Sequence, residues 1–301
     1  MTVPGALPGG GSVPAHAWMP QSPCGSGCVE APAPTVGRVR STARAIAAVI
    51  VMVAGIGVLL GLLVLRGRVR EGLLRGWFRG LLQAFGGRLR VHGPSRFQET
   101  AGRGVLVVSN HVSWLDELAI DAVQPIRMVA KRDIKDWPVL GALITGARTV
   151  YLDRERLSLR PGTVAELAGA LRDGAAVGVH AEGTTWCGLA SGRYRPALFQ
   201  SALDAGVPVR PVVLRYRLAG GVSTTRPAFV GAETLLDSIR RVLRMRGLVV
   251  EVHVLDEIAP GRAADRRELA ALVQAEAEHV MHGDLPVPEH HLTSTAVEAR
   301  R

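Results

Sequence analysis

Cysteine is scarce in this sequence, and the number and spacing of the cysteines argue against a fold stabilised by disulfides or by zinc. Three cysteines, Cys24, Cys28 and Cys187, occur in 301 residues, which is too few for the disulfide framework of a secreted domain. Cys24 and Cys28 have no second pair of ligands at zinc-binding spacing, so the sequence predicts no metal site. We therefore expect a protein of a reducing compartment.

Lysine is almost absent as well. Lys131 and Lys135 are the only two lysines, so arginine carries nearly all of the positive charge behind the net charge of +10. A surface this basic favours an anionic partner such as lipid headgroups, nucleic acid or a phosphorylated cofactor. The sequence has no helix-turn-helix, zinc-finger or aromatic-basic strand signature, and its arginines cluster around an apolar segment. We therefore expect membrane lipids, and no nucleic acid, as partners.

Both ends of the chain lack hydrophobic periodicity. Residues 1–37 are rich in Pro, Gly, Ala and Ser, and residues 285–301 are polar and contain proline, so we predict two disordered tails. Residues 1–37 also lack the basic and then apolar regions of a secretory signal peptide. With 48% hydrophobic residues, the chain is long enough for one α/β domain with an appendage, or for two small domains.

Residues 38–87 are predicted to anchor the chain to a membrane. Residues 45–65 carry no charge and are long enough to cross a hydrocarbon core of about 30 Å as a helix. Arginines flank this segment, more densely after it, so the positive-inside rule places the following domain on the cytoplasmic side of the cell membrane. A buried hairpin helix of a soluble protein is the alternative. Residues 69–85 predict a basic amphipathic helix, for the membrane surface or for packing on the domain.

Residues 88–284 alternate between short apolar runs and helical patterns. We predict strands over residues 89–92, 105–108, 128–130, 149–152, 177–180, 209–216 and 248–255. We predict helices over residues 164–171, 197–205, 234–243 and 266–280. Alternation of this kind indicates an α/β domain with a largely buried sheet between helices.

A polar turn with a histidine follows the predicted strand 105–108. A histidine placed there can sit at the mouth of a sheet, where ligands often bind. Asp116 lies five residues after His111 and can reach back to the imidazole, fix its tautomer and support its positive charge. That is the arrangement of a general base held by an acid. The spacing alone equally suits a surface histidine that caps a helix.

A second polar turn follows the predicted strand 177–180. Glu182 can bind a substrate hydroxyl there, and the amides of Gly183 and Thr184 can face a phosphate or an oxyanion. An ordinary strand-to-helix turn with a capping threonine is the alternative.

The order of these motifs resembles one family. Asn110-His111-x4-Asp116, followed about seventy residues later by Glu182-Gly183-Thr184, resembles the glycerolipid acyltransferases, which include lysophosphatidic acid acyltransferase. The stretch from Lys131 to Arg154 looks like that family's second block, and residues 207–212 look like its fourth. The four blocks cover roughly residues 89–217.

The resemblance implies a mixed, mostly parallel sheet flanked by helices, and the activity of an O-acyltransferase. His111 would act as general base on the hydroxyl of a lysophospholipid, oriented by Asp116. The oxygen would attack the thioester of acyl-CoA or acyl carrier protein directly, without a cofactor or metal. Lysophosphatidic acid, giving phosphatidic acid, is the expected acceptor. The implied substrate-binding residues are Asn110, Lys131, Arg154, Glu182, Gly183, Thr184 and Thr185.

The chain departs from the family pattern at the acceptor site. Thr185 stands where an arginine usually binds the acceptor phosphate, and His180-Ala181 replaces Phe-Pro. Losing a bidentate phosphate ligand matters, which leaves Lys131 and Arg154 as candidate phosphate contacts. The variant also resembles acyltransferases of lyso-ornithine lipids, an alternative acceptor. A non-catalytic, membrane-anchored lipid-binding adaptor on the same fold is the alternative from a different class.

Overall fold

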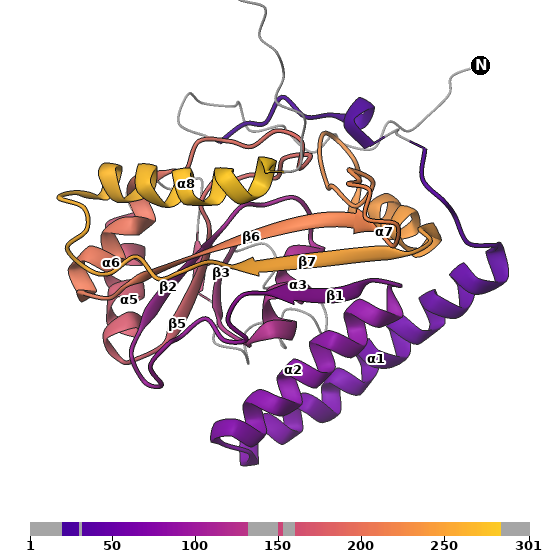
Figure 1. Cartoon of the computed structure of the whole chain (residues 1–301). Helices are drawn as coiled ribbons and strands as arrows, with labels where there is room; N and C mark the ends of the chain where they lie inside the picture. The colour runs from indigo at the N-terminus through magenta and orange to yellow at the C-terminus, as the bar shows by residue number, and fades with distance from the viewer. Residues whose placement is uncertain (1–19, 30–31, 132–149, 153–159, 284–301) are drawn as a thin grey trace, which may run out of the picture.

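The computed structural model describes residues 20–29, 32–131, 150–152 and 160–283, and its strands form one sheet of seven (Figure 1). The strands are β1 (Arg88–His92), β2 (Val105–Ser109), β3 (Arg127–Lys131), β4 (Val150–Leu152), β5 (Ala176–His180), β6 (Val209–Leu218) and β7 (Leu248–Val254). Their order is β1-β7-β6-β2-β5-β3-β4, and all pairs are parallel except β6 with β7. The predicted strands and the mixed, mostly parallel sheet are confirmed.

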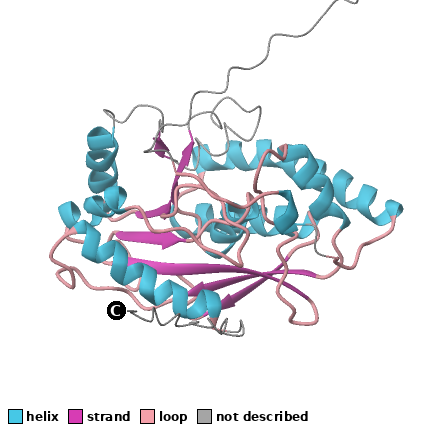
Figure 2. Ribbon diagram, turned by 90° about the horizontal axis from the view of Figure 1, so that it is seen from above, coloured by secondary structure: helices cyan, strands magenta, loops and turns pink. Residues whose placement is uncertain are grey.

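Helices cover both faces of the sheet (Figure 2). They are α1 (Arg38–Val64), α2 (Gly67–Ala84), α3 (Leu115–Val123), α5 (Arg160–Arg172), α6 (Gln200–Ala205), α7 (Leu235–Arg244) and α8 (Arg266–His282), with 3-10 turns η1 (Ser26–Val29) and η4 (Pro196–Phe199). The four helices predicted within residues 88–284 are confirmed as α5, η4 with α6, α7 and α8.

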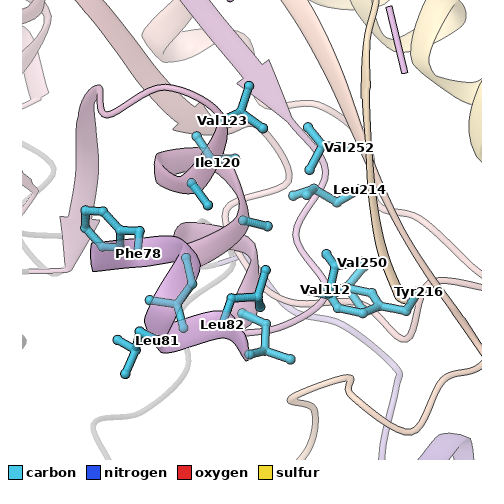
Figure 3. Packing of buried hydrophobic residues seen from close by; sticks show 14 of the residues in the cluster. Phe78, Leu81, Leu82, Val112, Ile120, Val123, Leu214, Tyr216, Val250 and Val252 are labelled. Carbon is cyan, nitrogen blue, oxygen red and sulfur yellow. The ribbon is translucent and has the colours of Figure 1, made fainter. Parts of the chain in front are cut away.

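The sheet separates two hydrophobic cores because successive side chains of a strand point to opposite faces. In β2, Val105 and Val107 join the core under α2, α3 and α7, whereas Leu106 and Val108 join the core under α5, α6 and α8. Figure 3 shows the first core, where Phe78 and Leu82 of α2 lie near Ile120 of α3. Burial on both faces explains why the strands read as continuous apolar runs.

Helices α1 and α2 form an antiparallel hairpin. The indole Nε1 of Trp77 donates to the carbonyl of Val51 over 2.7 Å, and the Arg44 guanidinium donates to the carbonyls of Leu243 and Met245 at the domain. Within the described residues, α1 is the one helix long and apolar enough to cross a membrane, and most of its surface is exposed.

The hairpin changes which arginines lie beside the domain. The sequence predicts that the arginines after α1 do so, but α2 runs back along α1 and puts Arg66 at the turn of the hairpin. The end of α1 that lies at the domain carries Arg40 and Arg44 instead. The apolar face of α2 packs against α1 and α3, and this packing makes α2 run back along α1 toward the domain.

Part of the predicted N-terminal tail packs on the domain. Cys24 and Val29 are buried, and the backbone of residues 34–36 pairs with residues 244–246 through the amides of Val36 and Arg246. Disorder is therefore a wrong prediction for residues 20–29 and 32–37, because this segment buries apolar side chains that composition alone did not distinguish. Residues 1–19 and 285–301 lie outside the described residues.

Candidate active site

The two predicted polar turns lie side by side because β2 and β5 are neighbouring parallel strands. Their register pairs Ser109 with His180, so both strands end at the same edge of the sheet. The backbone amide of Trp186 donates to the carbonyl of His111 over 2.8 Å and joins the two turns directly. Parallel strands present their carboxyl ends together, and ligands of open α/β sheets bind at such an edge.

Asp116 lies where the spacing predicts. Its Oδ2 accepts from His111 Nδ1 at 2.9 Å and from the amides of Val112 at 2.6 Å and Ser113 at 2.9 Å. The hydroxyl of Tyr216, from β6, donates to Oδ1. Asp116 is 0% exposed, and these four donors replace the water that an ionised carboxylate loses on burial. They hold both the carboxylate and the turn that carries His111.

The imidazole of His111 is arranged to accept a proton. Its Nδ1–H faces Asp116, which leaves the lone pair on Nε2, and no described side chain bonds that nitrogen. The side chain is 17% exposed, so a substrate can reach it. Burial and the positive charge of His180 lower the pKa of His111, against the raising influence of Asp116. The ring is therefore neutral at pH 7, as a general base requires.

His180 forms the floor beneath this ring. The two imidazoles stack with centroids 3.9 Å apart and an interplanar angle of 6°. His180 Nε2 bonds Glu117 at 3.0 Å, and its Nδ1 lies 2.8 Å from Ser109 Oγ. Burial disfavours a charged ring, but Glu117, Asp116 and the carbonyl of Asn110 together raise the pKa of His180. A partly cationic His180 under His111 helps to keep His111 neutral.

The pKa of Asp116 is lowered, which keeps it ionised beneath His111. Burial acts against ionisation, but the bond from His111, the charges of both histidines and the Ser113 amide outweigh it. The pair therefore combines an ionised acid with a neutral base.

Glu182 holds backbone rather than facing the solvent. Its Oε2 accepts from the amide of His111 at 2.6 Å and its Oε1 from the amide of Gly192 at 2.7 Å. Burial raises its pKa to about 7, although both amides and His180 act in the opposite direction. With one backbone amide on each oxygen, Glu182 positions the His111 turn. Its bond to a substrate hydroxyl stays a prediction.

Asn110 and Gly183 likewise bond to backbone. The side-chain NH₂ group of Asn110 donates to the carbonyl of Leu214 at 3.0 Å, and the side-chain oxygen of Asn110 accepts from the Leu214 N–H at 2.8 Å. These two bonds fasten the end of β2 to β6. Gly183 has φ +76°, and its N–H donates to the carbonyl of His180 at 3.2 Å. These contacts are internal to the protein, and the substrate contacts that the resemblance implies for both residues stay predictions.

Among the described residues, Thr185 bonds to protein backbone, whereas the backbone amide of Thr184 does not. The Thr185 hydroxyl donates to the carbonyl of Phe229, so it braces the turn. Thr184 is half-buried, and its amide makes no bond within the described part of the chain. Lys131 ends β3, beside Leu152 of β4; its side chain and the whole of Arg154 lie outside what the structure describes.

A cavity of about 330 Å³ opens beside the second turn. Its walls include His180, Gly183 and Phe199, and three of its lining residues are arginines: Arg195, Arg266 and Arg267. No acidic side chain lines it within the described residues. Such a cavity can take an apolar chain and a phosphate.

Sequence reasoning missed His180, Tyr216 and these arginines as site residues. His180 carried a usable signal, because it replaces an apolar residue at the end of a buried strand. Tyr216 and the arginines carried none, because only the fold brings β6, α8 and residue 195 to the two turns.

The chain is similar to known acyltransferases in sequence and in fold. The family model described as Acyltransferase matches residues 88–215. The chain is 36% identical to the 1-acyl-sn-glycerol-3-phosphate acyltransferase of Neisseria meningitidis, over 69% of this chain and 80% of that protein. It is 33% identical to the lyso-ornithine lipid O-acyltransferase of Pseudomonas aeruginosa, over 71% and 80%.

The fold is similar to the crystal structure of the 1-acyl-sn-glycerophosphate acyltransferase PlsC from Thermotoga maritima, with a TM-score of 0.64. That likeness covers 82% of this chain and 96% of the other at 16% sequence identity, and it bears on the fold alone.

Proposed function

This chain belongs to the glycerolipid acyltransferase family and is an O-acyltransferase of lysolipids, and we propose that His111 and Asp116 catalyse the transfer. The donor is acyl-CoA or acyl carrier protein, the acceptor is lysophosphatidic acid, and the product is phosphatidic acid. One observation carries this proposal. His111 presents a free Nε2 at the edge of the sheet while a fully buried carboxylate holds its Nδ1.

The chemistry follows from that geometry. His111 Nε2 takes the proton of the acceptor hydroxyl as its oxygen attacks the thioester carbonyl. The C–S bond then breaks, and the thiolate leaves with the proton from the imidazolium. Asp116 stabilises the imidazolium in between. The free amide of Thr184 supports a contact with the developing oxyanion or with a phosphate.

The acceptor phosphate is assigned to the arginines of the cavity. Thr185 carries no charge, but Arg195, Arg266 and Arg267 supply cations beside Gly183. Lys131 and Arg154 remain candidate phosphate contacts. A lyso-ornithine lipid is the second candidate acceptor, favoured by Thr185 and by the similarity to the Pseudomonas enzyme.

The α1–α2 hairpin supports association with the cell membrane. Its exposed residues include Ile46, Ile50, Val53 and Leu60, which favour insertion into the bilayer. The cytoplasmic side is proposed for the domain because a thioester donor is delivered from that side.

The decisive experiment incubates purified protein with labelled acyl-CoA and either lysophosphatidic acid or lyso-ornithine lipid. We expect phosphatidic acid, and at least about a thousandfold loss in His111→Ala, because general-base catalysis and proton return are lost together. His279→Ala, at an exposed position of α8, is the matched control. Full activity in His111→Ala would refute the mechanism. Lipid binding that ignores His111, without any acylated product, would establish the non-catalytic adaptor.

A second variant separates donor from acceptor binding. In Arg195→Ala, we expect KM to rise about tenfold for lysophosphatidic acid and to stay unchanged for acyl-CoA, since a lost charged hydrogen bond costs about 1.5–3 kcal/mol. A rise for acyl-CoA alone would assign the arginine to the donor.

A further inference from the structure

The fold brings together the three cysteines of the chain. Cys24 and Cys28 lie in the N-terminal segment, and Cys187 follows the Glu182 turn, more than 150 residues later. The three sulfur atoms all lie within 4.8 Å of one another. The distance between two sulfurs on one zinc ion is about 3.8 Å, from Zn–S bonds of about 2.3 Å in a tetrahedron. Small side-chain rotations close that difference.

The surroundings suit bound thiolates. Cys24 is 8% exposed and Cys187 4%, so the sulfurs are largely removed from water. Ser22 lies beside Cys24, and its hydroxyl oxygen accepts from the Cys24 backbone amide at 3.2 Å. Arg226 donates to the carbonyl of Val29, the residue after Cys28, at 3.2 Å.

The cluster lies against the catalytic turn. Pro20 packs on Gly183, so closely that a Cβ on Gly183 would stand 2.8 Å from the ring. Cys187 directly follows Trp186, whose amide bonds the carbonyl of His111. A link between Cys187 and the pair Cys24/Cys28 would therefore clamp residues 20–28 onto the turn that carries Glu182.

We propose that Cys24, Cys28 and Cys187 bind one zinc ion, which fastens the N-terminal segment to the catalytic turn. Soft thiolate ligands select zinc over magnesium or calcium, and three of them leave a fourth tetrahedral position for water. Binding releases the thiol protons to solvent, so occupancy rises with pH. In a reducing compartment, clustered cysteines bind metal more often than they form disulfides.

The test measures zinc in the full-length protein, purified in detergent without a histidine tag. We expect about one zinc per chain by mass spectrometry, and less than about a fifth of that in Cys187→Ser and in Cys24→Ser. His253→Gln is the control, because His92, Glu251 and His253 form the other described group with ligand spacing. That variant should retain its zinc.

Wild-type protein provides a second readout that needs no variant. Cobalt exchanged into the site should show thiolate-to-metal charge-transfer absorption. Chelation should expose three reactive thiols and speed hydrogen exchange of residues 20–28 at least tenfold. Purified protein that contains no metal and has three free thiols would overturn the proposal. A disulfide that a reductant opens would also overturn it, as would loss of zinc in His253→Gln but not in the cysteine variants. None of these outcomes depends on which lysolipid the enzyme uses.

Discussion

Asp116→Asn isolates the charge of the buried carboxylate from its structural role. The asparagine oxygen can take the place of Oδ2 and accept from His111 Nδ1 and from the amides of Val112 and Ser113. Its NH₂ group then meets the Tyr216 oxygen, which can accept. The tautomer of His111 and the turn are kept, and only the negative charge disappears.

The magnitude follows from Coulomb's law. A carboxylate about 4 Å from the imidazolium stabilises it by about 4 kcal/mol at an effective dielectric constant of 20. Each 1.36 kcal/mol corresponds to a factor of ten in rate, so the full interaction amounts to about three orders of magnitude. The ring is 17% exposed, and water replaces part of this stabilisation. We expect kcat to fall about 100- to 1,000-fold.

The dependence of activity on pH tests the same interaction independently, because the direction in which its acid limb should move can be predicted. A base must be unprotonated, so activity of the wild type should fall as pH drops through the lowered pKa of His111. Asp116 raises that pKa, so its neutralisation lowers the pKa further. The acid limb of Asp116→Asn should move to lower pH, below a reduced plateau.

The assay is initial-rate transfer of labelled acyl groups between pH 5 and 8, with Asp173→Asn, at an exposed position, as the matched control. A loss of kcat below about threefold, or an acid limb at higher pH, would contradict stabilisation of the imidazolium by the charge of Asp116. Asp116→Ala is less informative, because it leaves several buried donors unpaired at about 1–3 kcal/mol each and endangers folding.

Three further variants test individual contacts. Tyr216→Phe removes a donor to an ionised carboxylate, so unfolding free energy should fall by about 1.5–3 kcal/mol in denaturant titration; an unchanged midpoint contradicts the contact. Burial raises the pKa of Glu182 to about 7, above its ordinary value of about 4.3. The wild type should therefore lose about 3 kcal/mol of stability as pH rises from about 4.5 to 7. In Glu182→Gln this slope should disappear from thermal melts between pH 4.5 and 8, and its persistence would exclude Glu182 as its source. Arg210→Met leaves the carbonyls of Phe97 and Leu255 without their guanidinium donor, while Glu257 keeps Arg103, and should destabilise by about 1–3 kcal/mol; Arg172→Met, at an exposed position, is the control.

Local spacing indicated the part of the site that lies close together in the chain. The five residues between His111 and Asp116 allow their contact, and the order of the motif blocks favoured this pairing over a surface histidine that caps a helix. The backbone contacts of Glu182 and Asn110 could not be predicted, because their partners, the amide of Gly192 and the backbone of Leu214, are fixed by the loop and by β6. The predicted contacts of both residues with a substrate stay predictions.

The cysteines show the same limit at longer range. In the sequence, Cys24 and Cys28 have no second cysteine pair at zinc-binding spacing, which argues against a zinc site. That conclusion holds only if Cys187 lies far from both residues in the fold. The contact depends on the N-terminal segment crossing to residues 225–246, where Arg226 and Met245 hold it. Hydrophobic periodicity within a segment cannot predict a contact of this kind between distant segments.

The positions of the seven strands and the burial of the sheet follow from apolar runs, which depend on residues close together in the chain. The mostly parallel sheet and the roles of His111 and Asp116 come from the resemblance to the glycerolipid acyltransferases, which depends on four motif blocks over roughly residues 89–217. The tertiary structure decided how α2 returns along α1, that His180 stacks beneath His111, and that Cys187 meets Cys24. Each of these depends on which surfaces pack together, and packing is settled by the burial of side chains from distant segments.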